Sequence, residues 1–169
     1  PRKNVFIISS LWFTAVTLTH LYWMTANDYH GIYILFVWVI LSLSIGALFG
    51  LLTTHIYKAP LSLLRILFLA SLWAVQEKAR LYFFNGFPWA PAGIALTTND
   101  TALQLASLAG VYGLSFWVFF ANLVTYKALT SPRHLSRWFY AMACALLPLC
   151  YGTAHIYYNT TNTASSVNV

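Results

Sequence analysis

Residues 32–54 read IYILFVWVILSLSIGALFGLLTT, an apolar stretch without a single Asp, Glu, Lys or Arg. A helix needs about 20 mostly apolar residues to cross a hydrocarbon core of roughly 30 Å, and this stretch is long enough. It therefore predicts a membrane-spanning helix, and it indicates that the chain folds in lipid rather than in water.

The composition of the whole chain agrees with this helix. Of 169 residues, 60% are hydrophobic and 7% are charged, with three acidic residues against nine Lys and Arg. Soluble domains carry roughly a quarter of their residues as charged side chains, so a water-soluble domain is excluded. Disorder, a disulfide scaffold and a nucleic-acid partner are excluded too, because the net charge of +6 is spread out and both cysteines lie in an apolar run.

Similar apolar stretches recur along the chain. Five predicted spans cover about residues 5–24, 32–54, 61–84, 105–126 and 138–158. The third differs, because it carries Arg65 near its start and Glu77 and Arg80 near its end. We predict an all-α, multi-pass membrane helical bundle over residues 1–158, followed over residues 159–169 by a polar linker that could lead into a strand.

The positions of Lys and Arg predict the orientation, because basic loops stay in the cytoplasm. Alternating spans place seven basic residues on one side, and two basic and three acidic residues on the other. The N-terminus is therefore expected in the cytoplasm and the C-terminus outside the cell membrane. The seven cytoplasmic charges are Arg2, Lys3, Lys58, Arg65, Lys127, Arg133 and Arg137.

Charged residues inside a span are the first candidates for function. Counted from Leu61 at about 1.5 Å per residue, Glu77 lies about 24 Å and Arg80 about 28 Å along the helix, at the outer interface. Their spacing of i, i+3 allows an ion pair. This pair either ends the helix at the lipid headgroups or acts directly on a headgroup or partner domain. In the case of pairing, reversing both charges should preserve more function than either single reversal.

Residues 85–93 read NGFPWAPAG, in which two prolines and two glycines forbid a regular helix. Phe87 and Trp89 are too apolar for an ordinary exterior loop, which favours a structured reentrant or interfacial segment. The alternative is an aromatic anchor at headgroup level, as Tyr22, Trp23 and Tyr29 could be on the first outer loop.

Rows of small residues and one amide stand out within the spans. Ser42, Gly46 and Gly50, and separately Ala106, Gly110 and Gly113, predict closely packed helices. Asn122 is expected to be a buried amide that either joins helices or lines a polar cavity. No metal, cofactor or redox site is indicated, because the histidines are scattered and Cys144 and Cys150 lie six residues apart. Neither an activated nucleophile nor a paired acid and base is found, so no catalytic residue is assigned.

A family resemblance extends this interpretation. It rests on Trp73, Glu77 and Arg80, then Gly86, Phe87, Pro88 and Trp89, and then a span with Gly110, Tyr112, Gly113, Ser115, Phe116 and Asn122, preceded by Leu21, Tyr22 and Trp23 near the first outer loop. In this order and spacing the chain resembles the bacterial apolipoprotein N-acyltransferases. The Glu, Arg and Gly-Phe-Pro-Trp combination is the specific part of the match.

The resemblance implies an enzyme of the bacterial inner membrane that moves an acyl chain from a phospholipid to the N-terminal diacylglyceryl-cysteine of a lipoprotein. It implies that a nitrilase-like domain with a Glu, Lys and Cys triad follows in cis; this chain contains none of that triad and is expected to be a fragment that supplies lipid access and support. The expected substrate-binding residues are Glu77, Arg80, Phe87, Pro88, Trp89, Asn122 and Trp23. A non-catalytic membrane scaffold or a small transporter is the alternative, and only Asn122 and Pro148 suggest a transporter.

Overall fold

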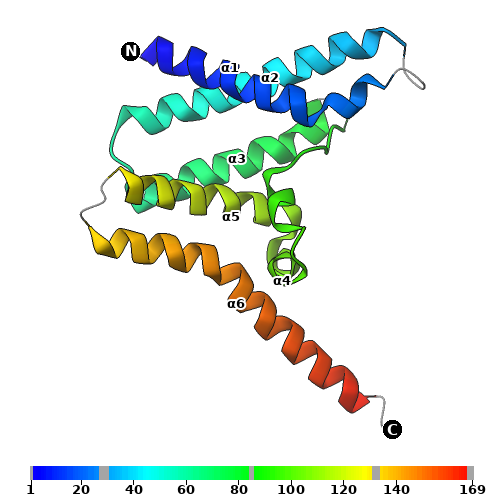
Figure 1. The fold of residues 1–169 in the computed structure, drawn as a ribbon, viewed down its shortest axis with the longest axis vertical. Coiled ribbons are helices and arrows are strands. Elements are labelled where there is room, and N and C mark those ends of the chain that lie inside the picture. The colour runs from blue at the N-terminus through cyan, green and yellow to red at the C-terminus, as the bar shows by residue number, and fades with distance from the viewer. Residues whose placement is uncertain (1, 27–30, 84–85, 131–133, 167–169) are drawn as a thin grey trace. The chain divides into compact units, whose positions relative to one another are not determined.

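The computed structural model describes residues 2–26, 31–83, 86–130 and 134–166, with side chains up to residue 159. Sequence predictions that concern Pro1, Asp28, Tyr29, Asn85, Arg133 or residues 167–169 lie outside this part. Throughout the described ranges the regular structure is helical, which confirms the all-α class (Figure 1). The elements are α1 (Arg2–His20), η1 (Tyr22–Thr25), α2 (Tyr33–Lys58), α3 (Leu63–Phe83), η2 (Ala92–Leu96), α4 (Asp100–Leu103), α5 (Ala106–Leu129) and α6 (Leu135–Ser166).

Each of the five long helices occupies one predicted span. Among the described residues, three helices are long and apolar enough to cross a membrane: α2, α5 and the Leu135–Asn159 part of α6. Spanning by α1 and α3, the count of five and the orientation stay predictions. Helix α6 runs on to Ser166, so the backbone of residues 159–166 is helical. Pro148 lies inside this helix, and α6 changes direction near its middle (Figure 1).

The five-span topology can be tested with reporter fusions. Because the basic residues alternate between sides, a cytoplasm-active reporter should give signal after residues 58 and 132, and a phosphatase active only outside the cytoplasm should give signal after residues 95 and 169. Phosphatase signal after residue 132, or its absence after residue 169, would contradict the topology.

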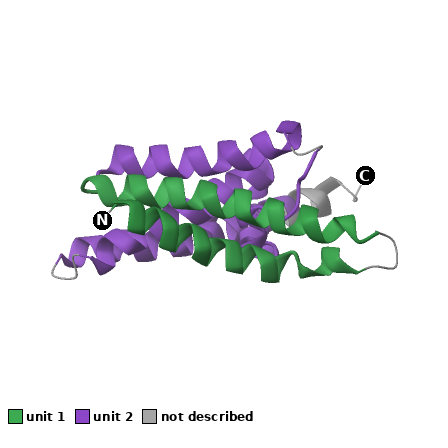
Figure 2. Cartoon of the chain, turned by 90° about the horizontal axis from the view of Figure 1, so that it is seen from above, with its two compact units in different colours: residues 1–61 green, residues 62–169 purple. Residues whose placement is uncertain are grey.

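The chain forms two compact units, residues 1–61 and 62–169 (Figure 2). This division is a feature that the sequence did not indicate. The predicted division between a helical part, 1–158, and a linker, 159–169, stays a prediction. Each unit has its own packing.

Unit 1 is an antiparallel hairpin of α1 and α2. A Cβ added to Gly46 would lie 2.7 Å from the carbonyl oxygen of Ser10, and one added to Gly50 would lie 2.9 Å from that of Phe6. The two backbones therefore approach as closely as the Ser42, Gly46 and Gly50 row predicts, and Ser42 is buried beside them.

Unit 2 is built on α5, which packs against α3, η2 and α6, while α4 packs on α6. Helix α5 is interrupted at Ala109 and Gly110, where Gly110 has a φ of +63°. An added Cβ at Gly110 would have no neighbour within 4 Å, so the prediction that Gly110 belongs to a close-packing row is wrong. The glycine is explained by the left-handed backbone at this break, which other residues rarely adopt.

Candidate functional site

The carboxylate of Glu77 is the centre of a buried cluster in unit 2. Glu77 is only 2% exposed, and its Oε1 accepts two hydrogen bonds. The indole Nε1 of Trp73, one turn earlier on α3, donates at 2.6 Å. The backbone N–H of Ala92, at the start of η2, donates at 2.8 Å. One oxygen atom therefore joins α3 to the segment that follows it.

Arg80 lies on the same face of α3 and supplies the countercharge. Its Nη2 is 3.7 Å from Glu77 Oε1, a distance that makes an ion pair rather than a hydrogen bond. This confirms the predicted i, i+3 pairing. The surroundings differ from the expected lipid headgroups, because Arg80 is 4% exposed and both side chains are covered by protein. Helix α5 packs against α3, the helix that carries both residues.

The segment over residues 86–91 has no regular structure, as its prolines and glycine predict. Gly86 has a φ of +79°, and Ala90 has a φ of +57°, which is uncommon for a residue with a side chain. Such a backbone persists only when its surroundings hold it. Two hydrogen bonds anchor its end: Ala92 to Glu77 on α3, and the N–H of Gly93 to Ser115 Oγ on α5 at 2.8 Å. The end of the segment is therefore held by the two helices, while its reentrant or interfacial position stays a prediction.

Aromatic packing fixes the same pair of helices. The Trp73 ring stacks on Phe119 of α5 with centroids 4.2 Å apart and an interplanar angle of 16°. Because its ring is held between α3 and α5, Trp73 presents its N–H to Glu77 in a defined direction. The carboxylate is thus positioned by packing on one side and by the backbone of η2 on the other.

Two buried polar atoms of the cluster make no hydrogen bond within the described residues. Within the described residues, neither Glu77 Oε2 nor Arg80 Nε has a hydrogen-bond partner, although both are buried. Buried polar atoms without partners are costly and usually have a structural or functional explanation. The cluster can therefore offer one acceptor and one donor to a further polar group.

The structure brings together some of the predicted site residues and separates others. Phe87 is half-buried, while Pro88 and Trp89 are exposed, with 53% of Trp89 accessible. Asn122 is exposed on α5 and its amide donates to the carbonyl of Val118 in the same helix, so its predicted burial is wrong. Trp23 belongs to unit 1 and lies in η1.

Three members of the cluster were not predicted as site residues: Trp73, Ala92 and Ser115. Trp73 and Ser115 are among the residues that carry the family resemblance, and Trp73 also stands at i−4 from Glu77 and so shares its helix face. Cys144 and Cys150 are free thiols on α6 and take no part in the cluster. The geometry is therefore that of an anchored segment with a buried charge pair.

Apolar helices of spanning length, together with a buried Glu–Arg pair that anchors an exposed aromatic segment, define a multi-pass helical membrane protein. A comparison with protein families identifies the family within this class. The family described as apolipoprotein N-acyltransferase N-terminal domain matches residues 1–124, and the chain belongs to this family.

Curated relatives agree with the family. Apolipoprotein N-acyltransferase of Geobacter metallireducens is 38% identical over 58 residues, 34% of this chain and 11% of the relative. The apolipoprotein N-acyltransferase of Rickettsia prowazekii is 29% identical over 93 residues, which are 54% of this chain and 19% of the relative. That of Caulobacter vibrioides is 38% identical over 74 residues, which are 43% of this chain and 14% of the relative. The matched stretch is thus under a fifth of each relative's length. No solved structure matches the chain.

Proposed function

We propose that this chain is the membrane-embedded part of an apolipoprotein N-acyltransferase of the bacterial inner membrane. The reaction transfers an acyl chain from a phospholipid to the N-terminal diacylglyceryl-cysteine of a lipoprotein. The observation that carries the proposal is the family match over residues 1–124, which includes the whole anchored segment. The relatives are apolipoprotein N-acyltransferases, which supports the reaction class.

Within this reaction the chain supplies lipid access and mechanical support. Both substrates carry acyl chains, so they arrive sideways from the bilayer. Pro88 and Trp89 present a rigid apolar surface, and Glu77 and Ser115 hold the end of that segment through Ala92 and Gly93. An exposed aromatic side chain on a fixed backbone suits contact with a lipid at headgroup depth.

The bond-making chemistry belongs to a nitrilase-like domain that follows in cis. Acyl transfer through a thioester needs an activated cysteine. Cys144 and Cys150 are free thiols on an apolar helix, where a thiolate is disfavoured. We therefore assign the catalytic residues to that domain and none to this chain.

The test is acyl transfer in vesicles. The full-length protein that contains this chain, reconstituted with phospholipid and a diacylated lipopeptide, should add a third acyl chain detectable by mass spectrometry. Trp89→Ala should lower kcat/KM for the phospholipid roughly tenfold, the equivalent of about 1.4 kcal/mol of lost apolar contact. Trp12→Ala, which removes a similarly exposed tryptophan from α1, is the matched control and should retain activity.

Two results would contradict the proposal. Residues 1–169 expressed alone should show no turnover, so turnover that survives replacement of Cys144 and Cys150 by alanine would overturn the division of labour. Equal kcat/KM values for Trp89→Ala and Trp12→Ala would contradict the proposed role of the aromatic segment in binding lipid.

A further inference from the structure

A groove of about 470 Å³ lies between α3, α5 and α6, at the end of α3 opposite to Glu77. Ile66 lines the groove and is eleven residues before Glu77, which corresponds to about 16 Å along the helix. The groove is therefore separate from the Glu77 cluster. Its volume is within the range of roughly 300–1,000 Å³ that is typical of small-molecule sites.

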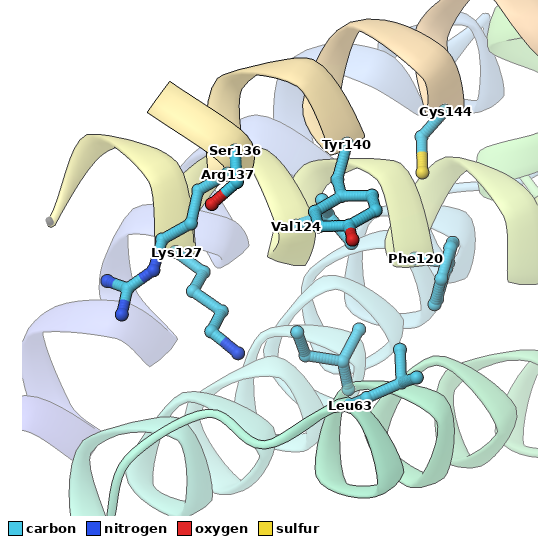
Figure 3. Close-up of a pocket in the computed structure, with 9 residues that line it drawn as sticks. Leu63, Phe120, Val124, Lys127, Ser136, Arg137, Tyr140 and Cys144 are labelled. Carbon is cyan, nitrogen blue, oxygen red and sulfur yellow. The ribbon is translucent and has the colours of Figure 1, made fainter. Parts of the chain in front are cut away.

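The lining of this groove is apolar over most of its length and basic at one end (Figure 3). Leu63 and Ile66 of α3 and Phe120 and Val124 of α5 form the apolar wall. Lys127 of α5 and Arg137 of α6 lie together at one end, and Cys144 lies toward the other. Ser136 lies at the basic end beside Arg137, whereas the ring of Tyr140 lies farther along the groove, between the basic end and Cys144.

The two cations lack an acidic partner in the described ranges. The acidic residues there are Glu77, which pairs with Arg80, and Asp100, which lies in the first turn of α4. Two like charges beside an apolar groove repel each other, and the low dielectric of the surroundings strengthens that repulsion. An anion between them would relieve it.

We propose that this groove binds one anionic phospholipid, with its phosphate between Lys127 and Arg137 and an acyl chain along the apolar wall. Charge complementarity selects the headgroup, and the order of basic end and apolar wall matches the order of phosphate and acyl chain in a lipid. Basic pockets between membrane helices are known to hold anionic headgroups. The bound lipid joins α3, α5 and α6 at the end of unit 2 that the Glu77 cluster does not reach.

Native mass spectrometry tests this site without reference to acyl transfer. The full-length protein that contains this chain is purified in mild detergent and equilibrated with equimolar phosphatidylglycerol and phosphatidylcholine of identical acyl chains. The protein should retain one phosphatidylglycerol in clear preference. Lys127→Gln and Arg137→Gln should each reduce that preference roughly fivefold, and the double variant roughly 25-fold.

Matched controls separate this site from general charge effects. Lys3→Gln with Lys58→Gln removes two cations that do not line the groove and should leave the preference unchanged. Circular dichroism should show equal helix content for all variants. Phosphatidylglycerol with short acyl chains should be retained less than the long-chain lipid, because the apolar wall then goes partly unused.

Three outcomes would overturn the proposal. The first is equal retention of the two lipids by the unmodified protein. The second is a double variant that keeps the preference of the unmodified protein. The third is displacement of phosphatidylglycerol by inorganic phosphate, which would indicate a site for a small anion only.

Discussion

Replacing Glu77 by alanine is expected to lower the free energy of unfolding by about 3–5 kcal/mol, the largest loss from any single change considered in this chain. The substitution leaves the Arg80 cation buried without its countercharge. It also removes the acceptor for two hydrogen bonds, from Trp73 and from Ala92. Thermal unfolding of the purified protein in detergent would measure the loss, and hydrogen exchange would follow the Ala92 amide.

Glu77→Gln separates the two contributions. Its amide oxygen can still accept from Trp73 and Ala92, so the Ala92 amide should stay protected while the charge pair is lost. Asp100→Asn, an exposed acid, is the control and should change little. Loss of protection at Ala92 in Glu77→Gln, or equal stability of Glu77→Ala and Asp100→Asn, would contradict this description of the cluster.

The structure also changes the expectation for the reversed pair. Spacing alone favours rescue when both charges are exchanged, because the pair would survive. An arginine at position 77, however, cannot accept the hydrogen bonds of Trp73 and Ala92. We now expect the double reversal to remain as impaired as the single reversal of Glu77.

Gly93→Ala is expected to destabilise unit 2 by about 1–3 kcal/mol through overpacking. A Cβ at this position would lie 2.6 Å from the Val111 carbonyl oxygen, 2.8 Å from Leu114 Cβ and 2.9 Å from Ser115 N. All three atoms belong to the rigid body of α5, so η2 must move away. Its hydrogen bond to Ser115 Oγ would lengthen, and the Gly93 amide should exchange faster in deuterated solvent.

Two variants serve as comparisons for the destabilisation by Gly93→Ala. Ser115→Ala removes the same hydrogen bond without a clash and should destabilise by less, about 1 kcal/mol. Gly31→Ala adds a methyl whose nearest neighbour, Tyr33, is at an ordinary 3.4 Å, and it should be nearly neutral. If Gly93→Ala unfolds at the same temperature as Gly31→Ala, η2 is not pressed against α5.

The positions of the helices were predictable because they depend on local composition. A run such as 32–54 carries no charged side chain and is apolar enough to enter a membrane, where the backbone has to satisfy its own hydrogen bonds. Its helix is therefore required wherever the rest of the chain lies. The close approach at Gly46 and Gly50 and the ion pair of Glu77 with Arg80 were predictable for the same reason. Both depend on spacing within a single helix.

What the sequence by itself determined is therefore the set of apolar helices, the non-helical segment after α3 and the family. Only the tertiary structure decided that Glu77 is buried, that the segment is held through Ala92 and Gly93, that Asn122 faces outward and that Lys127 and Arg137 share a groove. The physical reason is that hydropathy and helical period act over one or two turns. The bonds from Glu77 to Ala92 and from Gly93 to Ser115 join residues 15 and 22 positions apart, and these contacts exist only once α3, η2 and α5 have packed together.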